Sequence, residues 1–204
     1  ITKTNKFVWQ LLEELPLNYG ILAGPIMAEE ILNKKPTVGV IAFRDNSAFS
    51  LVKPLFSPPF HLISYERPKD LSVAGTLKNV YALFLGIVDG LKLGGNAKAY
   101  FLIKSLREMR ILARRFRADL LAINTLAGMG DLALTAYSPV SDNRQQGEKI
   151  AKKQKPQPCE GLRTLEFLVR KVKNKDELPL LRALEEIVFK QKDAKKAILD
   201  ILPR

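Results

Sequence analysis

The stretch Gly75-Thr76-Leu77-Lys78-Asn79-Val80 places a lysine and an asparagine inside a long apolar segment that runs from Leu71 to Leu93. Apolar residues recur in this segment at intervals of three and four, which is the spacing of a helix. They are Val73, Leu77, Val80, Tyr81, Phe84, Ile87, Val88 and Leu91. A second face of the same helix carries three small residues and one cation, namely Gly75, Ala82, Gly86 and Lys78.

Lys78 has two interpretations on this face. Small neighbours allow a ligand to approach the backbone, and a partly desolvated lysine is suited to proton transfer in a reaction. Alternatively, the small residues pack against a second helix and Lys78 extends to water. Periodicity alone favours packing, at roughly two to one.

Composition sets the outer limits. A chain of 204 residues can bury a core, in one domain or in two small ones. The 33 basic and 21 acidic residues give a net charge of +12, which permits a nucleic-acid, anionic-membrane or phosphorylated partner. One cysteine excludes a disulfide within the chain and fits a reducing, cytoplasmic setting. A single histidine and a single cysteine argue against a zinc site, so no metal is expected. We also expect no signal peptide and no apolar stretch long enough to span a membrane.

The first part of the chain alternates strands and helices, the pattern of an α/β sheet. Expected strands cover 18–23, 37–43 and 60–65, and expected helices cover 7–15, 28–33 and 46–55. The run 37–43 is almost entirely apolar and β-branched, as in a strand that is buried on both faces.

The strand pattern stops at Pro68-Lys69-Asp70, where Asp70 is the expected N-cap of a helix. Beyond it we expect only helices, at 71–93, 97–117, 120–126, 132–137, 145–153, 161–173, 180–190 and 194–202. The predicted architecture is therefore an α/β portion over residues 1–67, followed by an all-helical domain over residues 68–204.

Three short segments have the residue types of a binding site. Gly24-Pro25 follows a strand, where a glycine lets a ligand approach the backbone, although an ordinary turn has the same sequence. Asp131 follows Gly128-Met129-Gly130, and it can either cap a helix or orient a lysine, with equal weight. Ser141-Asp142-Asn143-Arg144 offers a hydroxyl, an amide and a guanidinium near a helix start, which suits an oxyanion such as phosphate, although a solvated loop is the alternative.

A basic stripe occurs at three- and four-residue spacing, made of Lys104, Arg107, Arg110, Arg114 and Arg117. Such a stripe can meet nucleic acid. A solvated helix face is the more frequent explanation, at roughly three to one, because few aromatic residues are interleaved. We therefore expect no nucleic-acid partner.

Together these motifs resemble those of bacterial NAD(P)-dependent glycerol-3-phosphate dehydrogenase. Gly75–Val80 resembles the family's Gly-Ala-x-Lys-Asn-Val motif, and Ser105–Met109 resembles its Gly-Leu-x-Glu-Met segment. Ala127–Thr135 is similar to Ala-Gly-Leu-Gly-Asp-Leu-x-Leu-Thr, and Glu160-Gly161 resembles a later Glu-Gly pair. The four segments follow the family's order across nearly the whole chain.

The resemblance implies the tail of a Rossmann-type NAD(P)-binding domain, then a helical domain like the C-terminal domain of 6-phosphogluconate dehydrogenase. It implies hydride transfer between NAD or NADP and dihydroxyacetone phosphate, giving sn-glycerol 3-phosphate for phospholipid synthesis, in a cytoplasmic homodimer. Lys78 would be the general acid–base, in a cleft within reach of Asp131. The implied substrate-binding residues are Gly24, Lys78, Asp131, Ser141, Asn143 and Lys3. The implied cofactor-binding residues are Ala28, Glu160 and Lys3.

The chain departs from the family pattern at several points. Thr4 replaces the glycine that follows the lysine matched by Lys3, and Ile26 replaces a hydroxyl residue that touches substrate. The family's glycine-rich dinucleotide loop does not occur here, so this chain alone is expected to bind cofactor poorly. Asp142 stands where the family has an arginine, and its carboxylate would repel phosphorylated ligands; Arg144 could supply the charge instead.

Two further interpretations stay open beside the dehydrogenase. One is a non-catalytic relative that kept the helical domain as a binding or assembly module, which an upstream sequence without an intact glycine-rich loop would favour. The other is a nucleic-acid-binding helical domain, which a steep salt dependence of DNA binding would favour.

Overall fold

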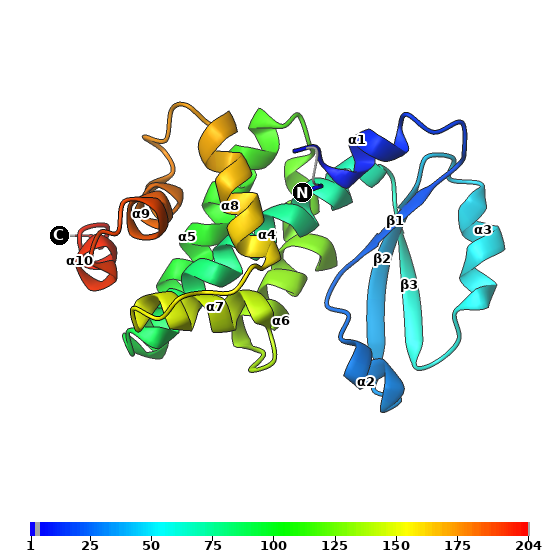
Figure 1. Cartoon of the computed structure of the whole chain (residues 1–204). Coiled ribbons are helices and arrows are strands. Elements are labelled where there is room, and N and C mark those ends of the chain that lie inside the picture. Colours follow the sequence, from blue (N-terminus) through cyan, green and yellow to red (C-terminus); the bar gives the residue numbers. More distant parts are fainter. Residues whose placement is uncertain (3–4, 204) are drawn as a thin grey trace. The chain divides into compact units, whose positions relative to one another are not determined.

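The computed structural model describes residues 1–2 and 5–203. It contains two compact units, and Figure 1 labels their elements. The first unit comprises Ile1–Thr76 and Ala113–Leu134, and the second comprises Leu77–Leu112 and Thr135–Arg204. Two long helices, α4 (Pro68–Gly90) and α5 (Gly94–Arg115), each contribute to both units. The division into a nucleotide-binding portion and a substrate-binding domain after residue 67 stays a prediction.

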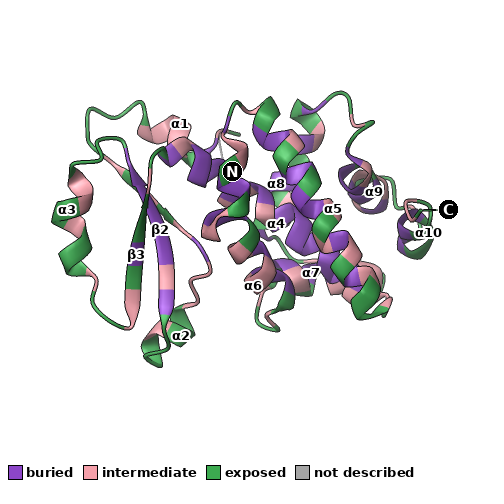
Figure 2. Ribbon diagram, turned by 180° about the vertical axis from the view of Figure 1, so that it is seen from behind, coloured by how far each residue is buried: buried purple, intermediate pink, exposed green. Residues whose placement is uncertain are grey.

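The first unit contains a three-stranded sheet in the order β1 (Gly20–Ala23), β2 (Thr37–Phe43) and β3 (Phe60–Tyr65). β1 runs antiparallel to β2, and β2 runs parallel to β3. All three strands were predicted from the sequence. Six of the seven residues of β2 are buried, as expected for a strand covered on both faces (Figure 2).

Short helices accompany the strands. They are α1 (Val8–Leu12), α2 (Ala28–Leu32), α3 (Ala48–Val52) and the 3₁₀ turn η1 (Lys53–Leu55). Buried Ile41, Phe43 and Leu62 form the apolar cluster of the sheet, against which residues of α3 pack. This unit also includes the 3₁₀ helix η2 (Leu120–Asn124) and a π-helical turn, η3 (Leu126–Gly130).

The prediction that Asp70 is the N-cap of this helix is wrong. α4 begins at Pro68, whose fixed φ and missing N–H suit the first turn of a helix. The Asp70 side chain is buried and instead accepts hydrogen bonds from Arg67 Nε (2.7 Å) and from the backbone N–H of Asp119 (2.9 Å). Asp70 therefore links the start of α4 to the segment after α5.

α4 is long and apolar enough to cross a membrane by length and composition, so the expectation that no such stretch exists does not hold as stated. Its most apolar window is 83% buried inside the protein, which is also what the central helix of a globular core shows. Figure 2 shows the helix buried along most of its length.

The remaining helices lie mainly in the second unit. They are α6 (Asp131–Tyr137), which begins in the first unit, α7 (Asp142–Ala151), α8 (Glu160–Lys171), α9 (Pro179–Phe189) and α10 (Ala194–Leu199). α9 packs against α8 and α10, and α7 packs against α8 and α10. The predicted helices correspond to these, and most differences are shifts of a few residues at the ends, where helix boundaries are least defined.

Two glycines let α4 and α7 approach at backbone distance. A Cβ added to Gly86 would lie 2.2 Å from the carbonyl oxygen of Arg144, and one added to Gly147 would lie 2.1 Å from that of Leu83. Helix packing is therefore confirmed as the role of Gly86. In contrast, a Cβ at Gly75 meets nothing within 4 Å.

This contrast gives a paired prediction on one helix. Gly86→Ala should lower the free energy of unfolding by about 1–3 kcal/mol, because backbone must shift to admit the methyl group. Gly75→Ala is the matched control and should raise it by roughly 0.5–1 kcal/mol, since alanine loses less backbone entropy in a helix. Urea titration of both variants measures the difference. Equal effects of the two substitutions would contradict the close contact.

Glu108 is a buried carboxylate that joins three helices of the second unit. It accepts hydrogen bonds from the Tyr81 hydroxyl (3.0 Å) and from the backbone N–H groups of Leu180 (2.6 Å) and Leu181 (3.0 Å). The two N–H groups belong to the first turn of α9, which lacks intrahelical partners for them. Burial raises the pKa of Glu108 to about 7, although these donors act in the opposite direction.

The raised pKa predicts a pH-dependent stability. A carboxyl that titrates near 4.5 when unfolded and near 7 when folded holds its proton more tightly in the folded state. Its contribution is therefore fully present below pH 4.5 and is lost as the pH rises to about 7. That loss is on the order of 3 kcal/mol. Unfolding measured against pH in wild type and Glu108→Gln should show that this component of the slope disappears in the variant; identical slopes would contradict it.

The basic stripe, which lies on α5 except for Arg117 just beyond it, is largely exposed, as predicted. Arg107, Arg110, Arg114 and Arg117 are all exposed, and Lys104 lies over the ring of Tyr100 at 5.3 Å from its centroid. The absence of a nucleic-acid role stays a prediction.

Candidate functional site

Lys78 forms a hydrogen bond with the side chain of Thr135 in the second unit. Its Nζ donates a hydrogen bond to Thr135 Oγ1 at 2.9 Å, and the residue is half-buried. Thr135 lies on α6, one helical turn after Asp131, so the two side chains project from the same face of that helix. The packing interpretation expected Lys78 to extend to water. The hydrogen bond to Thr135 shows that it does not simply do so.

Next to Lys78, Asn79 begins a network of hydrogen bonds. Asn79 Nδ2 donates to Glu160 Oε2 (2.9 Å), and Asn79 Oδ1 accepts from Asn143 Nδ2 (3.0 Å). Asn143 Oδ1 accepts in turn from the backbone N–H of Gly161 (2.7 Å). Each amide thus donates and accepts at once, so the network fixes the orientation of both. It ties α4, α7 and the first turn of α8 together.

The Glu160-Gly161 pair needs its glycine for this approach. A Cβ at Gly161 would lie 2.7 Å from the carbonyl oxygen of Asn79 and 2.9 Å from Asn143 Oδ1. The network therefore explains why a residue without a side chain follows Glu160.

Ser141 is the N-cap of α7, and its Oγ accepts from the backbone N–H of Arg144 at 3.3 Å. Asp142 is exposed as the first residue of this helix. Burial raises the pKa of the Cys159 thiol, and the carboxylates of Asp142 and Glu160 act in the same direction. The first turns of α7 and α8 lie together, because Asn143, the residue after Asp142, accepts from the backbone N–H of Gly161.

Arg144 is engaged elsewhere. Its Nε donates to Asp89 Oδ2 (2.7 Å), and its Nη2 pairs with Glu148 Oε1 (2.8 Å). Two of its nitrogens, Nε and Nη2, are therefore engaged by carboxylates within the protein, and the replacement of the missing arginine charge by Arg144 stays a prediction.

Gly24 and the segment before Asp131 lie together in the first unit. Gly24 is buried with φ +128°, a conformation that residues with a side chain rarely adopt, so a glycine is required at the end of β1. A Cβ on Gly130 would lie 3.7 Å from Pro25 Cδ. A cavity of about 350 Å³ is lined by residues of β2, β3 and η3, among them Val40, Ile63 and Gly130.

Asp131 is already helical (φ −71°, ψ −34°) and opens α6 directly after the π-helical turn. It therefore does not occupy an N-cap position. Gly128 is required because a Cβ there would lie 2.4 Å from the carbonyl oxygen of Ile123.

The predicted site residues divide between the two units. Lys78, Ser141, Asn143 and Glu160 belong to the second unit, where the contacts above connect three of them to neighbouring helices. Gly24, Ala28 and Asp131 belong to the first, and Ala28 is the exposed first residue of α2. The proximity of Lys78 to Asp131 stays a prediction, and Lys3 lies outside the described residues.

Sequence reasoning assigned no role to Asn79 or to Thr135. Both lie inside quoted motifs, and a polar residue on a buried helix face is the signal that could have identified them. Glu108 carries the same signal in its own motif.

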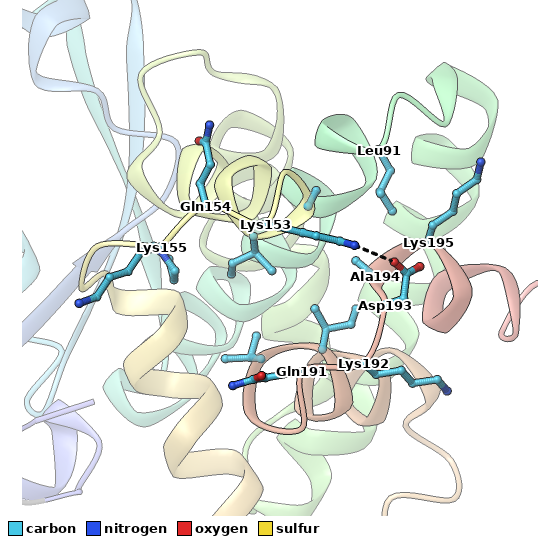
Figure 3. Close-up of a pocket in the computed structure, with 14 residues that line it drawn as sticks. Leu91, Lys153, Gln154, Lys155, Gln191, Lys192, Asp193, Ala194 and Lys195 are labelled. Atoms are coloured by element: carbon cyan, nitrogen blue, oxygen red, sulfur yellow. Dashed lines mark ion pairs between the residues drawn. The ribbon is translucent and has the colours of Figure 1, made fainter.

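A larger cavity of about 580 Å³ lies in the second unit, where the C-terminal ends of α7 and α9 meet the start of α10 (Figure 3). None of the predicted site residues that the structure describes lines it. Lys153 and Asp193 pair across it at 3.7 Å, with the Lys153 side chain 83% exposed. Lysines at helix C-terminal ends compensate the helix dipole, which accounts for those at α7 and α9 without a ligand.

Comparisons with known proteins agree on one family. The family profile described as NAD-dependent glycerol-3-phosphate dehydrogenase C-terminus matches residues 70–199. The glycerol-3-phosphate dehydrogenase [NAD(P)+] of Solidesulfovibrio magneticus is 32% identical over 196 residues, covering 91% of this chain and 59% of that protein. The corresponding protein of Deinococcus radiodurans is 39% identical over 173 residues, covering 82% of this chain and 53% of that protein.

A solved structure agrees with these relatives. The glycerol-3-phosphate dehydrogenase of Coxiella burnetii has a TM-score of 0.88 at 27% identity and covers 100% of this chain and 66% of that one. The chain thus spans roughly three-fifths of the length of such relatives. Because the profile covers most of the chain, the protein belongs to the NAD-dependent glycerol-3-phosphate dehydrogenase family and corresponds to its C-terminal part.

Proposed function

We propose that the full-length protein is an NAD(P)-dependent glycerol-3-phosphate dehydrogenase, which transfers a hydride between NAD(P)H and C2 of dihydroxyacetone phosphate. The observation that carries this is the Lys78–Thr135 hydrogen bond beside the Asn79, Asn143 and Glu160 network. A held cation and, from the next residue of α4, a set of fixed amides suit a carbonyl substrate that gains a proton as it is reduced.

In the proposed reaction, Lys78 Nζ donates a proton to the C2 oxygen as the carbonyl becomes a hydroxyl, and it takes that proton back in the reverse direction. Thr135 fixes the direction of the ammonium group. Asp131 orients Lys78 and the substrate. Ser141 and Asn143 contact the substrate or its phosphate, and Gly24 is a further proposed substrate-binding residue. Lys3 acts as a second lysine at the site.

NAD(P)H supplies the hydride when it is bound. The described residues fit the uncharged part of this cofactor, because the Glu160 carboxylate can accept hydrogen bonds from hydroxyl groups such as those of a ribose. They do not fit its phosphates equally well, since the exposed, acidic Asp142 directly precedes Asn143, whose side chain bonds the same helix start. Ala28 and Glu160 are the proposed cofactor contacts.

The proposal extends to the setting of the enzyme. Residues 1–67 would complete a Rossmann-like domain, and residues 68–204 would form a helical domain of the 6-phosphogluconate dehydrogenase type. The enzyme would act as a cytoplasmic homodimer and supply glycerol 3-phosphate for glycerophospholipid synthesis.

The second candidate is a non-catalytic relative that serves as a binding or assembly module. It is favoured by one observation: Asp142 is acidic, and Arg144 is already paired with Asp89 and Glu148. The Asp142 carboxylate repels a phosphate, and the positive charge of Arg144 is partly balanced by two carboxylates.

NAD(P)H oxidation by the full-length protein separates the two. Dihydroxyacetone phosphate should support turnover, and dihydroxyacetone should support much less, because it lacks the phosphate that Ser141 and Asn143 are proposed to bind. Absence of turnover with either cofactor, although the protein is folded and carries an intact glycine-rich loop upstream, would give first place to the binding module.

A further inference from the structure

A chain of alternating charges joins three helices, α4, α5 and α7, in the second unit. Lys98 Nζ and Arg144 Nε both donate to the same oxygen, Asp89 Oδ2, each at 2.7 Å. Arg144 continues the chain to Glu148 at 2.8 Å. Asp89 lies at the end of α4, Lys98 near the start of α5, and Arg144 in the first turn of α7.

These charges are shielded from water. The side chain of Lys98 is 8% exposed, that of Asp89 19% and that of Arg144 20%. A charge at this depth is strongly destabilising once its partner is removed. Lys98, Asp89 and Arg144 therefore depend on one another for their positions.

Lys98 also holds the end of α6. Its Nζ donates to the carbonyl oxygen of Ala136 at 2.8 Å and lies 4.1 Å from the ring centroid of Tyr137. Carbonyl groups in the last turn of a helix lack intrahelical partners, so this bond fixes where α6 ends. Lys98 thus holds Ala136 in the last turn of α6, and Asp89 holds Arg144 in the first turn of α7.

Only a short connection lies between these two anchors. It ends at Ser141, the N-cap of α7, and Asn143 follows in the first turn. The contact of Gly86 with the Arg144 backbone fixes the same turn independently.

We infer that Lys98 and Asp89 are positioning residues for substrate binding, which set the place of Ser141 and Asn143 through the ends of α6 and α7. The inference rests on the proposed function. Neither residue contacts substrate; each acts through the segment that does. Arg144 accordingly serves in this cluster as a structural cation whose charge is balanced by Asp89 and Glu148.

Kinetics of the full-length enzyme test the inference. Lys98→Met should raise KM for dihydroxyacetone phosphate roughly ten- to hundredfold, which is the effect of losing one hydrogen bond to a charged group. KM for NADH should change much less. Lys98→Arg should restore KM for the substrate, since a guanidinium can also bond Asp89 and a carbonyl oxygen. Lys104→Met, on the same helix but outside the cluster, is the matched control.

A second readout does not depend on turnover. Hydrogen exchange of the backbone amides over 137–144 should accelerate in Lys98→Met and in Asp89→Asn, whereas the amides of α9 should keep their protection. General destabilisation would instead accelerate exchange uniformly over the protein, lower kcat and raise KM for both substrate and NADH. That result would overturn the inference. So would unchanged exchange over 137–144. If wild type shows no turnover, the proposed function fails, and the exchange pattern alone decides the role of the cluster.

Discussion

Asp142→Arg in the full-length protein is expected to raise kcat/KM for dihydroxyacetone phosphate by about two orders of magnitude. An arginine at this position would present a planar, permanently charged donor to phosphate oxygens. Hydrogen bonds to charged groups contribute about 1.5–3 kcal/mol each, and 1.4 kcal/mol corresponds to tenfold in affinity. The substitution also removes a carboxylate that repels the ligand.

The structure strengthens this expectation in two respects. Asp142 is exposed, so an arginine can be accommodated there without repacking a core. Arg144, the alternative cation, is paired with Asp89 and Glu148, so part of its charge is already balanced within the protein. A small loss of stability should accompany the gain, because an acidic residue in the first turn of α7 favours the helix dipole by about 0.3–1 kcal/mol.

Asp142→Asn is the matched control for this gain. It removes the repulsion without adding a donor, so its kcat/KM should lie between those of wild type and Asp142→Arg. Steady-state oxidation of NADH and NADPH measures all three proteins. If wild type is already fully active and Asp142→Arg has no effect, Ser141 to Asn143 do not bind the phosphate in the way proposed.

Lys78→Met is expected to lower kcat by about 10²–10⁴-fold, the usual contribution of a general acid–base group. Methionine preserves much of the volume and the apolar stem of lysine but cannot transfer a proton. Because wild type is expected to be a weak enzyme, the sharper comparison introduces Lys78→Met into the Asp142→Arg protein. KM for the substrate should change far less than kcat if Lys78 acts chiefly in the transition state.

Thr135→Val separates the proton-transfer role of Lys78 from its orientation. It removes the hydroxyl that accepts from Lys78 Nζ and keeps the β-branched shape. A loss of roughly tenfold, smaller than that of Lys78→Met, is expected for a net hydrogen-bond contribution of about 1 kcal/mol or slightly more. Retention of activity in Lys78→Met, with a normal unfolding transition, would exclude Lys78 as the general acid–base.

Local patterns in the sequence predicted most of the secondary structure. Strand β2 was evident from a β-branched apolar run, and α4 from apolar residues at helical spacing. Both signals come from neighbouring residues along the chain and are therefore readable without tertiary contacts. The start of α4 was misplaced because Pro68 and Asp70 are both compatible with a helix start, and only the bond from Asp119 shows which role Asp70 has.

The candidate site was only partly readable in the same way. Motif resemblance selected Lys78, Asn143 and Glu160, and the family comparison agrees with the resemblance as a whole. The connection of Asn143 and Glu160 through Asn79 could not be predicted, because its two hydrogen bonds join residues 64 and 81 positions apart in the chain.

By itself, then, the sequence determined which segments form strands and helices, the family, and the charge reversal at Asp142. Only the tertiary structure decided what the buried polar groups do. Glu108 binds the first turn of α9, Lys98 the last turn of α6, and Arg144 is held by Asp89. The physical reason is that a buried charge must find a partner, and the partner is determined by which helices pack together, whereas spacing along the chain determines only the face on which the charge lies.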